Sequence, residues 1–436
     1  METKPELSSH HRWTTGQKIA FRFFFLFLTL QIFTENFLGN LFGGTLFIWR
    51  LGEKIFVRPC LWLNDHIFHF KYIPQSWTTF SGSLHTIRDT VYLLLAFLVG
   101  GLWTIVDRKR ANYNKLFYWF SRFLVVALSC IVFAYGIIKV FPVQMSPPSR
   151  MGLYTPVGDL SPFNLLWTTF GYGRPYQIFT GFFEALGAIL VLFNRTRVAG
   201  LLFIIAVMIN VIMLNYTYQI GVLVMSAYIL LIAFFLLAPG LKQLVRFFLI
   251  QQPAVLQQNE YVPGKNVATI LLKTLALLFI GTSFTLNILF AYNRYTKTEN
   301  INRSREYSLV KNYIVNSDTL KLIENDTLCW RFWSERVADG KRFVTIATMK
   351  PGLYKTYAIE RDTLKRTLSL HPFSGNDTAS LNFSYRDINK INWCLSGTSG
   401  QKNIKVELER INPDTIMNLL KTKRTIIVFD DESDSE

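Results

Sequence analysis

An acidic residue in the middle of an apolar segment is the feature of this sequence with the most direct chemical implication. Glu184 lies in the otherwise uncharged run from Tyr176 to Asn194. In an α-helix it would lie roughly 12 Å from Tyr176, near the middle of a hydrocarbon layer about 30 Å thick. An ionisable group at that depth has to face protein or water, so Glu184 is the first candidate for a functional residue.

Small residues predict which way Glu184 faces. Gly181, Ala185 and Ala188 recur with it at helical spacing, and small residues let another helix approach closely. We therefore expect Glu184 to face the interior of a helix bundle. Polar residues on the preceding and following apolar runs are its candidate partners: Lys139, Asn210 and Asn215.

The connection 141–175 is rich in Pro and Gly, so we expect turns, no long regular structure, and a lid over the outer mouth of the bundle. It adds three candidate ligand-binding residues: Asp159, Trp167 and Arg174. Two interpretations stay open. Either Glu184, Asn210 and Lys139 form a polar pocket for a lipid-soluble head group such as a quinone or isoprenoid, or Glu184 bonds to a neighbouring helix and locks the bundle.

Apolar runs too long for soluble core helices predict a polytopic membrane protein, because half of the 436 residues are hydrophobic. We predict seven spans: 19–38, 89–106, 118–140, 176–194, 198–214, 220–239 and 267–290. Within the first span, Arg22 and Glu35 lie near the ends, where such side chains snorkel to the interface.

The net charge of +17 flanks these spans rather than forming a groove with exposed aromatic residues, so we exclude nucleic acid as a partner. The basic clusters place the N-terminus in the cytoplasm and the C-terminal region outside. Two sets of residues in the predicted outer segments are candidates for a metal site or a disulfide. His66 and His69 share a helical face in an interfacial segment, where we expect no metal site, and Cys329 and Cys394 could pair or stay free.

Period-two alternation begins after residue 297. Segments such as 342–348, 354–360 and 403–409 alternate between apolar and polar residues and are separated by turn clusters. About eight antiparallel strands of this length predict a small barrel or sandwich, followed by a short helix, a last strand and an acidic tail. The predicted organisation is 1–110 N-terminal spans, 111–250 four-span core, 251–296 linker and last span, and 297–436 extracytoplasmic β domain.

Motifs of known enzyme classes are absent, including the nucleophile elbow, the phosphate-binding loop and the zinc-protease helix. A set of segments nevertheless resembles the bacterial DoxX-like membrane proteins: 133–145, 158–171, 181–184, 195–197 and 238–239. The resemblance implies a four-helix core in a bacterial inner membrane, with Glu184, Asp159, Trp167 and Arg195 matching the family pattern. His85 and Gln219 depart from it, since relatives tend to carry acidic residues there.

The expected function follows from both lines of reasoning. We expect an inner-membrane protein that binds a lipid-soluble ligand or a partner membrane protein, with no demonstrable catalysis and no demonstrable cofactor. The alternative is a subunit of a quinone-linked oxidoreductase, because some relatives are similar to such subunits; a quinone would then be the cofactor and Glu184 would handle protons.

Overall fold

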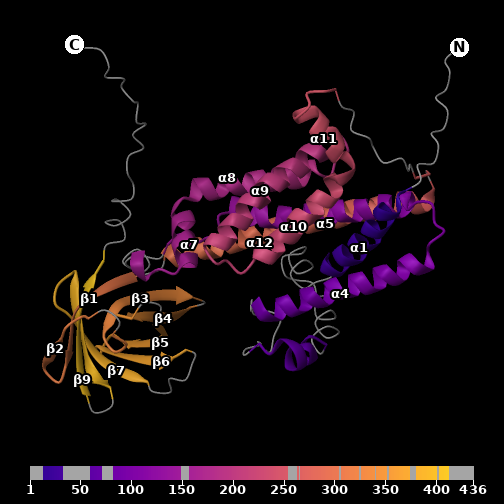
Figure 1. The fold of residues 1–436 in the computed structure, drawn as a ribbon. Helices are drawn as coiled ribbons and strands as arrows, with labels where there is room; N and C mark the ends of the chain where they lie inside the picture. The colour runs from indigo at the N-terminus through magenta and orange to yellow at the C-terminus, as the bar shows by residue number, and fades with distance from the viewer. Residues whose placement is uncertain are drawn as a thin grey trace, which may run out of the picture. The chain divides into compact units, whose positions relative to one another are not determined.

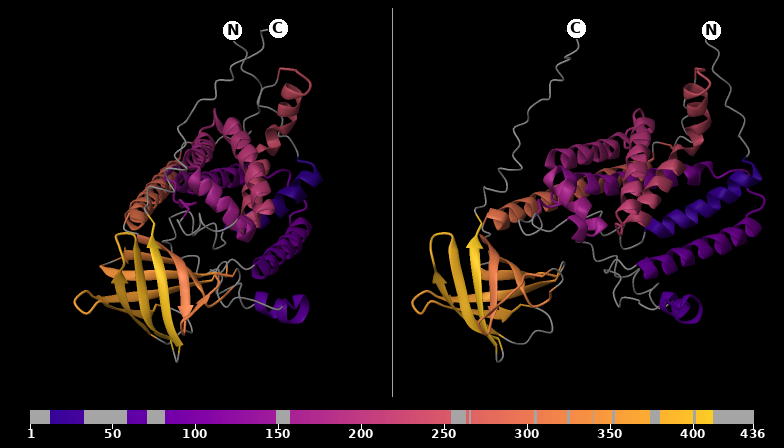
Figure 2. Two further views of the ribbon diagram at one scale, coloured as in Figure 1. Left: turned by 90° about the vertical axis from the view of Figure 1, so that its left-hand side faces the viewer. Right: turned by 60° about the vertical axis from the view of Figure 1, so that its left-hand side comes forward.

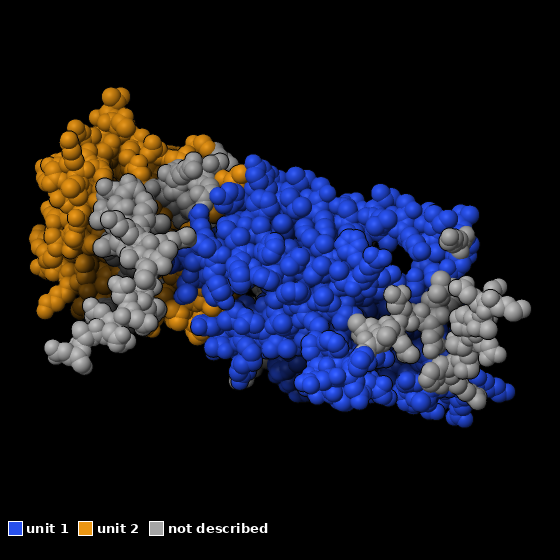
Figure 3. Space-filling view, turned by 90° about the horizontal axis from the view of Figure 1, so that it is seen from above, with its two compact units in different colours: residues 1–146, 169–295 blue, residues 147–168, 296–436 orange. Residues whose placement is uncertain are grey.

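The computed structural model shows a set of long helices followed by a β-barrel (Figure 1). It describes residues 13–32, 59–70, 82–148, 157–253, 263–264, 266–303, 306–323, 326–338, 340–350, 353–373, 380–399 and 402–411. The chain divides into two compact units, coloured separately in Figure 3. The first comprises residues 1–146 and 169–295, and the second comprises 147–168 and 296–436.

Each predicted span corresponds to a helix in the structure. The helices are α1 (Thr15–Ile32), α4 (Gly82–Val106), α5 (Asn114–Val140), α8 (Arg174–Leu190), α9 (Arg197–Thr217), α10 (Leu223–Leu237) and α12 (Val267–Arg303). In the described part of the chain, 5 helical stretches are long and apolar enough to cross a membrane: Thr86–Val106, Asn114–Val140, Arg197–Thr217, Leu223–Phe248 and Val267–Thr298. The first and fourth predicted spans, at α1 and α8, are not among them, so seven remains a prediction.

Four of these helices form a closed ring. The helix α5 packs against α8 and α10, and α9 packs against the same two helices (Figure 1). Their buried side chains form one apolar core, to which Leu128, Ile204 and Ile232 contribute. Outside the ring, α1 packs against α4 and α5. The ring gives Glu184 on α8 two neighbouring helices, α5 and α9, as possible partners.

Arg22 does not snorkel, contrary to the prediction. Its side chain is buried in α1, and all three of its nitrogens donate hydrogen bonds. The acceptors are the Tyr113 hydroxyl at 2.9 Å, the Thr104 hydroxyl at 3.0 Å and the Asp107 carbonyl at 2.8 Å. Because each guanidinium nitrogen has an acceptor within the protein, Arg22 can stay buried, and it ties α1 to the α4–α5 connection. Glu35 lies outside the described residues.

The connection 141–175 contains a regular helix that we did not expect, α7 (Pro162–Tyr172). Proline is compatible with the first helical position because its missing N–H would have no partner there. The hydroxyl of Ser161 accepts a hydrogen bond from the Asn164 N–H, which caps the start. A short 3-10 turn, Val157–Asp159, precedes it. The lid role of this connection remains a prediction.

Two other short helices lie in the connections. The segment 59–63 is helical and continues into the π-helical turn Asn64–Phe68, where the His66 ring stacks on Trp62 and His69 follows in the left-handed conformation. After α10, a 3-10 turn (Ala238–Gly240) leads into α11 (Leu241–Phe248), whose Lys242 and Arg246 lie one helical turn apart. Such an amphipathic helix suits the interface between membrane and water.

The second unit contains an antiparallel barrel (Figure 2). Its strands are β1 (Glu306–Val315), β2 (Asp318–Leu320), β3 (Trp330–Ala338), β4 (Lys341–Thr348), β5 (Tyr354–Asp362), β6 (Thr367–Pro372), β7 (Leu381–Asp387), β8 (Asn392–Ser399) and β9 (Lys402–Arg410). Strands β3 to β9 pair in chain order, β1 pairs with both β3 and β9, and β2 pairs only with β1. The eight strands other than β2 therefore close, which selects the barrel over the sandwich and leaves no open edge in the ring.

Alternation along the strands builds the interior of the barrel. On β5 and β6, Tyr357, Ile359, Leu368 and Leu370 are buried, while their neighbours are more exposed. Gly397 on β8 allows close pairing, because a side chain there would collide with the Asn382 carbonyl on β7. The predicted helix 414–421, the last strand 425–430 and the acidic tail lie outside the described residues.

Cys329 and Cys394 are both buried and free, so the disulfide alternative is wrong. Cys394 lies on β8, which pairs with β7 and β9, whereas Cys329 immediately precedes β3 on another part of the barrel wall. Burial, with a further contribution from Asp326, raises the pKa of the Cys329 thiol to about 11.

We expect Cys329 to resist alkylation in the folded protein, since the thiolate is the reactive form and is scarce at pH 8. Iodoacetamide labelling followed by peptide mass spectrometry should find Cys329 unmodified in the native protein and fully modified after denaturation. Rapid labelling of the native protein at pH 8 would contradict this prediction.

Candidate functional site

The structure joins two of the predicted site residues directly. Lys139 Nζ donates to both carboxylate oxygens of Glu184, at 2.7 and 2.6 Å. The two side chains are only 10% and 1% exposed, so this is a buried ion pair between α5 and α8. Lys139 also lies in the last turn of α5, where a cation is favoured by the helix dipole. Both charges are therefore compensated within the bundle.

Close helix packing surrounds this ion pair. An added side-chain carbon at Gly181 would lie 2.6 Å from the Gly136 carbonyl, and one at Gly136 would lie 2.7 Å from the Ala185 nitrogen. One turn further along, the Ser129 hydroxyl donates to the Ala188 carbonyl at 2.7 Å. The small-residue face predicted on α8 thus meets α5 almost backbone to backbone. This geometry supports the helix-locking interpretation of Glu184 over the pocket interpretation.

The other two candidate partners lie elsewhere. Asn215 is buried but donates to the Ser226 hydroxyl at 2.8 Å, which links α9 to α10. Asn210 is exposed on α9 and has no hydrogen bond to Glu184. The prediction that Asn210 joins Glu184 and Lys139 in one polar pocket is therefore wrong, because the helical rotation of α9 turns this residue outward.

The three candidates from the connection 141–175 lie on three different elements. Trp167 is half-buried on α7, with its ring centroid 4.0 Å from that of Phe163. Arg174 is half-buried and begins α8. The side chain of Asp159 lies outside the described residues. The ligand-binding role of these three residues stays a prediction.

A second buried polar group in the helical unit was missed by the sequence reasoning. Arg88 on α4 pairs with Asp89 at 3.0 Å, and Gln31 on α1 donates to the same carboxylate at 3.3 Å. The side chains of Arg88 and Asp89 are 6% and 15% exposed. Both residues lie at the start of the predicted span 89–106, where position in the sequence does not distinguish a buried charge from one that flanks a span.

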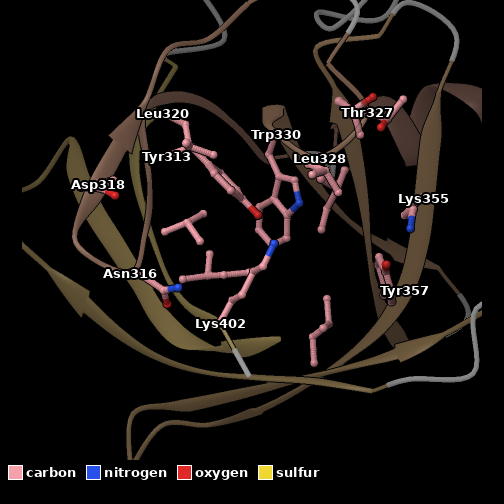
Figure 4. A pocket seen from close by; sticks show the side chains of 15 residues that line it. Tyr313, Asn316, Asp318, Leu320, Thr327, Leu328, Trp330, Lys355, Tyr357 and Lys402 are labelled. Carbon is pink, nitrogen blue, oxygen red and sulfur yellow. The ribbon is translucent and has the colours of Figure 1, made fainter. Parts of the chain in front are cut away.

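One end of the barrel encloses a space for a ligand. A cavity of about 600 Å³ lies there, within the range of small-molecule sites (Figure 4). It is lined by Tyr313, Val315, Asn316, Asp318, Leu320, Thr327, Leu328, Trp330, Ile346, Thr348, Lys355, Tyr357, Leu381, Lys402 and Ile404. These residues come from the end of the barrel where β1 and β4 finish and β3, β5, β7 and β9 begin.

Aromatic rings and polar groups share the wall of this cavity. The Tyr313 and Trp330 rings contact each other with centroids 5.8 Å apart, and both residues are almost fully buried. Tyr313, Trp330 and Lys402 point their polar ends into the cavity (Figure 4). Burial, together with Cys329 and Asp326, raises the pKa of Tyr313 to about 12, so its hydroxyl is a donor at neutral pH.

The other end of the barrel is filled. Trp333 packs edge-on against Trp393, with centroids 5.6 Å apart, and the Trp393 indole donates to the Ser308 hydroxyl at 3.1 Å. Glu335 accepts from the Trp333 indole and from Arg361, each at 2.8 Å. The barrel interior is therefore closed by packed side chains at one end and contains the cavity at the other. The sequence predicts its strands but not its cavity, because the size of the interior depends on strand closure.

Comparisons with known proteins add little. No family profile matches the chain, and no solved structure matches it. The chain is 33% identical over 108 residues to the uncharacterized protein YwoB of Bacillus subtilis (strain 168). That alignment covers 24% of this chain and 66% of YwoB, so it spans slightly less than two thirds of the relative.

Proposed function

We propose that this chain is a bacterial inner-membrane protein that binds a lipid-soluble ligand in its C-terminal barrel. The observation that carries the proposal is the cavity of about 600 Å³, which has an aromatic and aliphatic wall and a few convergent polar groups. Eight-stranded barrels have an interior of the size that holds one small ligand. We therefore assign ligand binding to the barrel and not to the pocket expected at Glu184 in the helix bundle.

The helical unit anchors this binding module in the membrane. Its basic connections support an orientation with the N-terminus in the cytoplasm and the barrel in the periplasm. The resemblance to DoxX-like proteins is part of this proposal, since the ring of α5, α8, α9 and α10 is the kind of four-helix core that the resemblance implies. A partner membrane protein and the quinone-linked alternative remain predictions from that resemblance.

Filling the cavity should abolish ligand binding. Ile404 lines the cavity from β9, so Ile404→Trp should occupy the space, while Ile404→Val keeps the wall apolar. We expect the wild-type chain and Ile404→Val, purified in nanodiscs, to bind the neutral fluorescent probe N-phenyl-1-naphthylamine saturably and one to one. Ile404→Trp should show only the linear partitioning of the probe into the lipid.

Circular dichroism and the melting temperature of each variant check that the barrel is intact. Equal saturable binding by Ile404→Trp and the wild type, with both folded, would show that the ligand site is not this cavity. Native mass spectrometry of the wild-type protein then identifies the natural ligand that Ile404→Trp should lack.

A further inference from the structure

Three hydrogen-bond donors point into the barrel cavity from three different strands. Tyr313 lies on β1, Trp330 on β3 and Lys402 on β9 (Figure 4). A phenol at neutral pH, an indole and an ammonium can all donate, and the last two cannot accept. The site is therefore richer in donors than an apolar ligand alone would require.

These donors have no protein acceptor in the part of the chain that the structure describes. The indole nitrogens of Trp333 and Trp393 donate to Glu335 and Ser308, but that of Trp330 makes no such bond. Among the same residues, Lys405 pairs with Glu407, whereas Lys402 forms no ion pair. Polar groups in a partly desolvated site gain most from a ligand that satisfies them.

The formal charge of the residues that line the cavity is positive, which also favours a hydrogen-bond acceptor that carries negative charge. The lining contains two lysines, Lys355 and Lys402, and one acidic residue, Asp318, so its formal net charge is +1. Hydrogen bonds from an ammonium to an anion are stronger than those between neutral groups. An anionic acceptor therefore fits this end of the cavity better than an alcohol or an amine does.

We infer that the barrel selects an amphipathic anion, whose apolar body fills the cavity and whose carboxylate or phosphate ester accepts hydrogen bonds from Lys402, Trp330 and Tyr313. This inference rests on the proposed function, because it names the ligand class for the same cavity. The apolar body packs against Val315, Ile346 and Leu381, which line the cavity with the aromatic rings. Neither covalent chemistry nor a metal is involved.

Displacement of the neutral probe by a matched ten-carbon series tests the inference on the full chain in nanodiscs of phosphatidylcholine. We expect decanoate and decyl phosphate to displace the probe at concentrations about tenfold lower than decanol, with decylamine the weakest. Raising the salt concentration should weaken decanoate binding and leave decanol unchanged, because a charge interaction near the surface is screened. Decyl phosphate against decanoate distinguishes the two anion types.

Substitutions at Lys402 provide a second test of the ligand class. Lys402→Gln should weaken decanoate by about tenfold and leave decanol unchanged, and Lys402→Arg should retain most of the preference. Lys365 is a matched control, since it is exposed in the β5–β6 turn and does not line the cavity. Lys365→Gln should bind both ligands like the wild type.

The outcomes separate the two proposals. Equal displacement by decanoate and decanol, or no effect of Lys402→Gln on decanoate binding, overturns the inference that the ligand is an anion. In that case the cavity is still the binding site if Ile404→Trp removes saturable binding of the probe. If the probe does not distinguish the wild type from a folded Ile404→Trp variant, both proposals fail.

Discussion

Replacing Lys139 with Met should lower the free energy of unfolding of the helical unit by about 3–5 kcal/mol. The Met side chain is unbranched like that of Lys and one heavy atom shorter, and it leaves the Glu184 carboxylate, 1% exposed, without its partner. Desolvation of an unpaired charge is the largest electrostatic penalty available inside a bundle. Unfolding titrations with sodium dodecyl sulfate from a mild detergent measure the loss.

The double variant Lys139→Met/Glu184→Leu separates pairing from packing. It removes both charges together, so most of the lost stability should return even though no ion pair remains. Lys115→Met is the control, because Lys115 is exposed near the start of α5 and should change stability by less than about 0.5 kcal/mol. If the double variant is as unstable as Lys139→Met alone, the loss arises from packing and the argument from charge is wrong.

The double variant Lys139→Met/Glu184→Leu also tests whether Glu184 takes part in ligand binding. If the helical unit only anchors and the pair only locks α5 to α8, the double variant should bind the neutral probe in the barrel as well as the wild type does. A loss of probe binding in a fully folded double variant would return Glu184 to the list of ligand-binding residues.

Gly181→Ala should destabilise the bundle by about 1–3 kcal/mol, in spite of the better helix propensity of Ala. The added carbon would lie 2.6 Å from both the Gly136 carbonyl and the Lys139 side chain, and 2.8 Å from the Val140 nitrogen. Two of these three neighbours are backbone atoms, which cannot rotate away, so the helices have to separate. Thermal unfolding followed by near-ultraviolet circular dichroism measures the change.

An identical substitution with open surroundings gives the comparison. Gly281 lies in α12, where an added carbon would meet nothing within 4 Å. Gly281→Ala should therefore keep the stability or raise it by up to about 1 kcal/mol through helix propensity. Equal effects of the two substitutions would contradict the close approach of α5 and α8 at Gly181.

Local patterns predict much of the fold. Long apolar runs in the sequence indicate all seven helices, although α1 and α8 do not meet the length and hydropathy of a span within the described residues. Strand alternation indicates the β domain. The α7 helix was missed because the Pro and Gly residues of the connection 141–175 were interpreted as turn residues, whereas a first-position proline such as Pro162 is compatible with a helix.

The sites were predicted less well, and the reason is geometric. Glu184 and Lys139 were both named as candidates, since each is an isolated charge next to or within an apolar run. Asn210 was placed with them by depth alone, yet depth along a helix does not specify the direction in which a side chain points. Arg88 and Asp89 were not named as candidates, although they lie at the start of the predicted span 89–106.

What the sequence determined by itself is the periodicity of each segment and the burial requirement of its charges, because both depend on neighbours within a few residues. A carboxylate in the apolar run 176–194 had to find a partner, whatever the fold. Only the tertiary structure decided that the partner is Lys139 and that the strands close around a cavity containing Lys402, Trp330 and Tyr313. These residues lie far apart in the chain, and the register and closure that unite them are properties of the whole barrel.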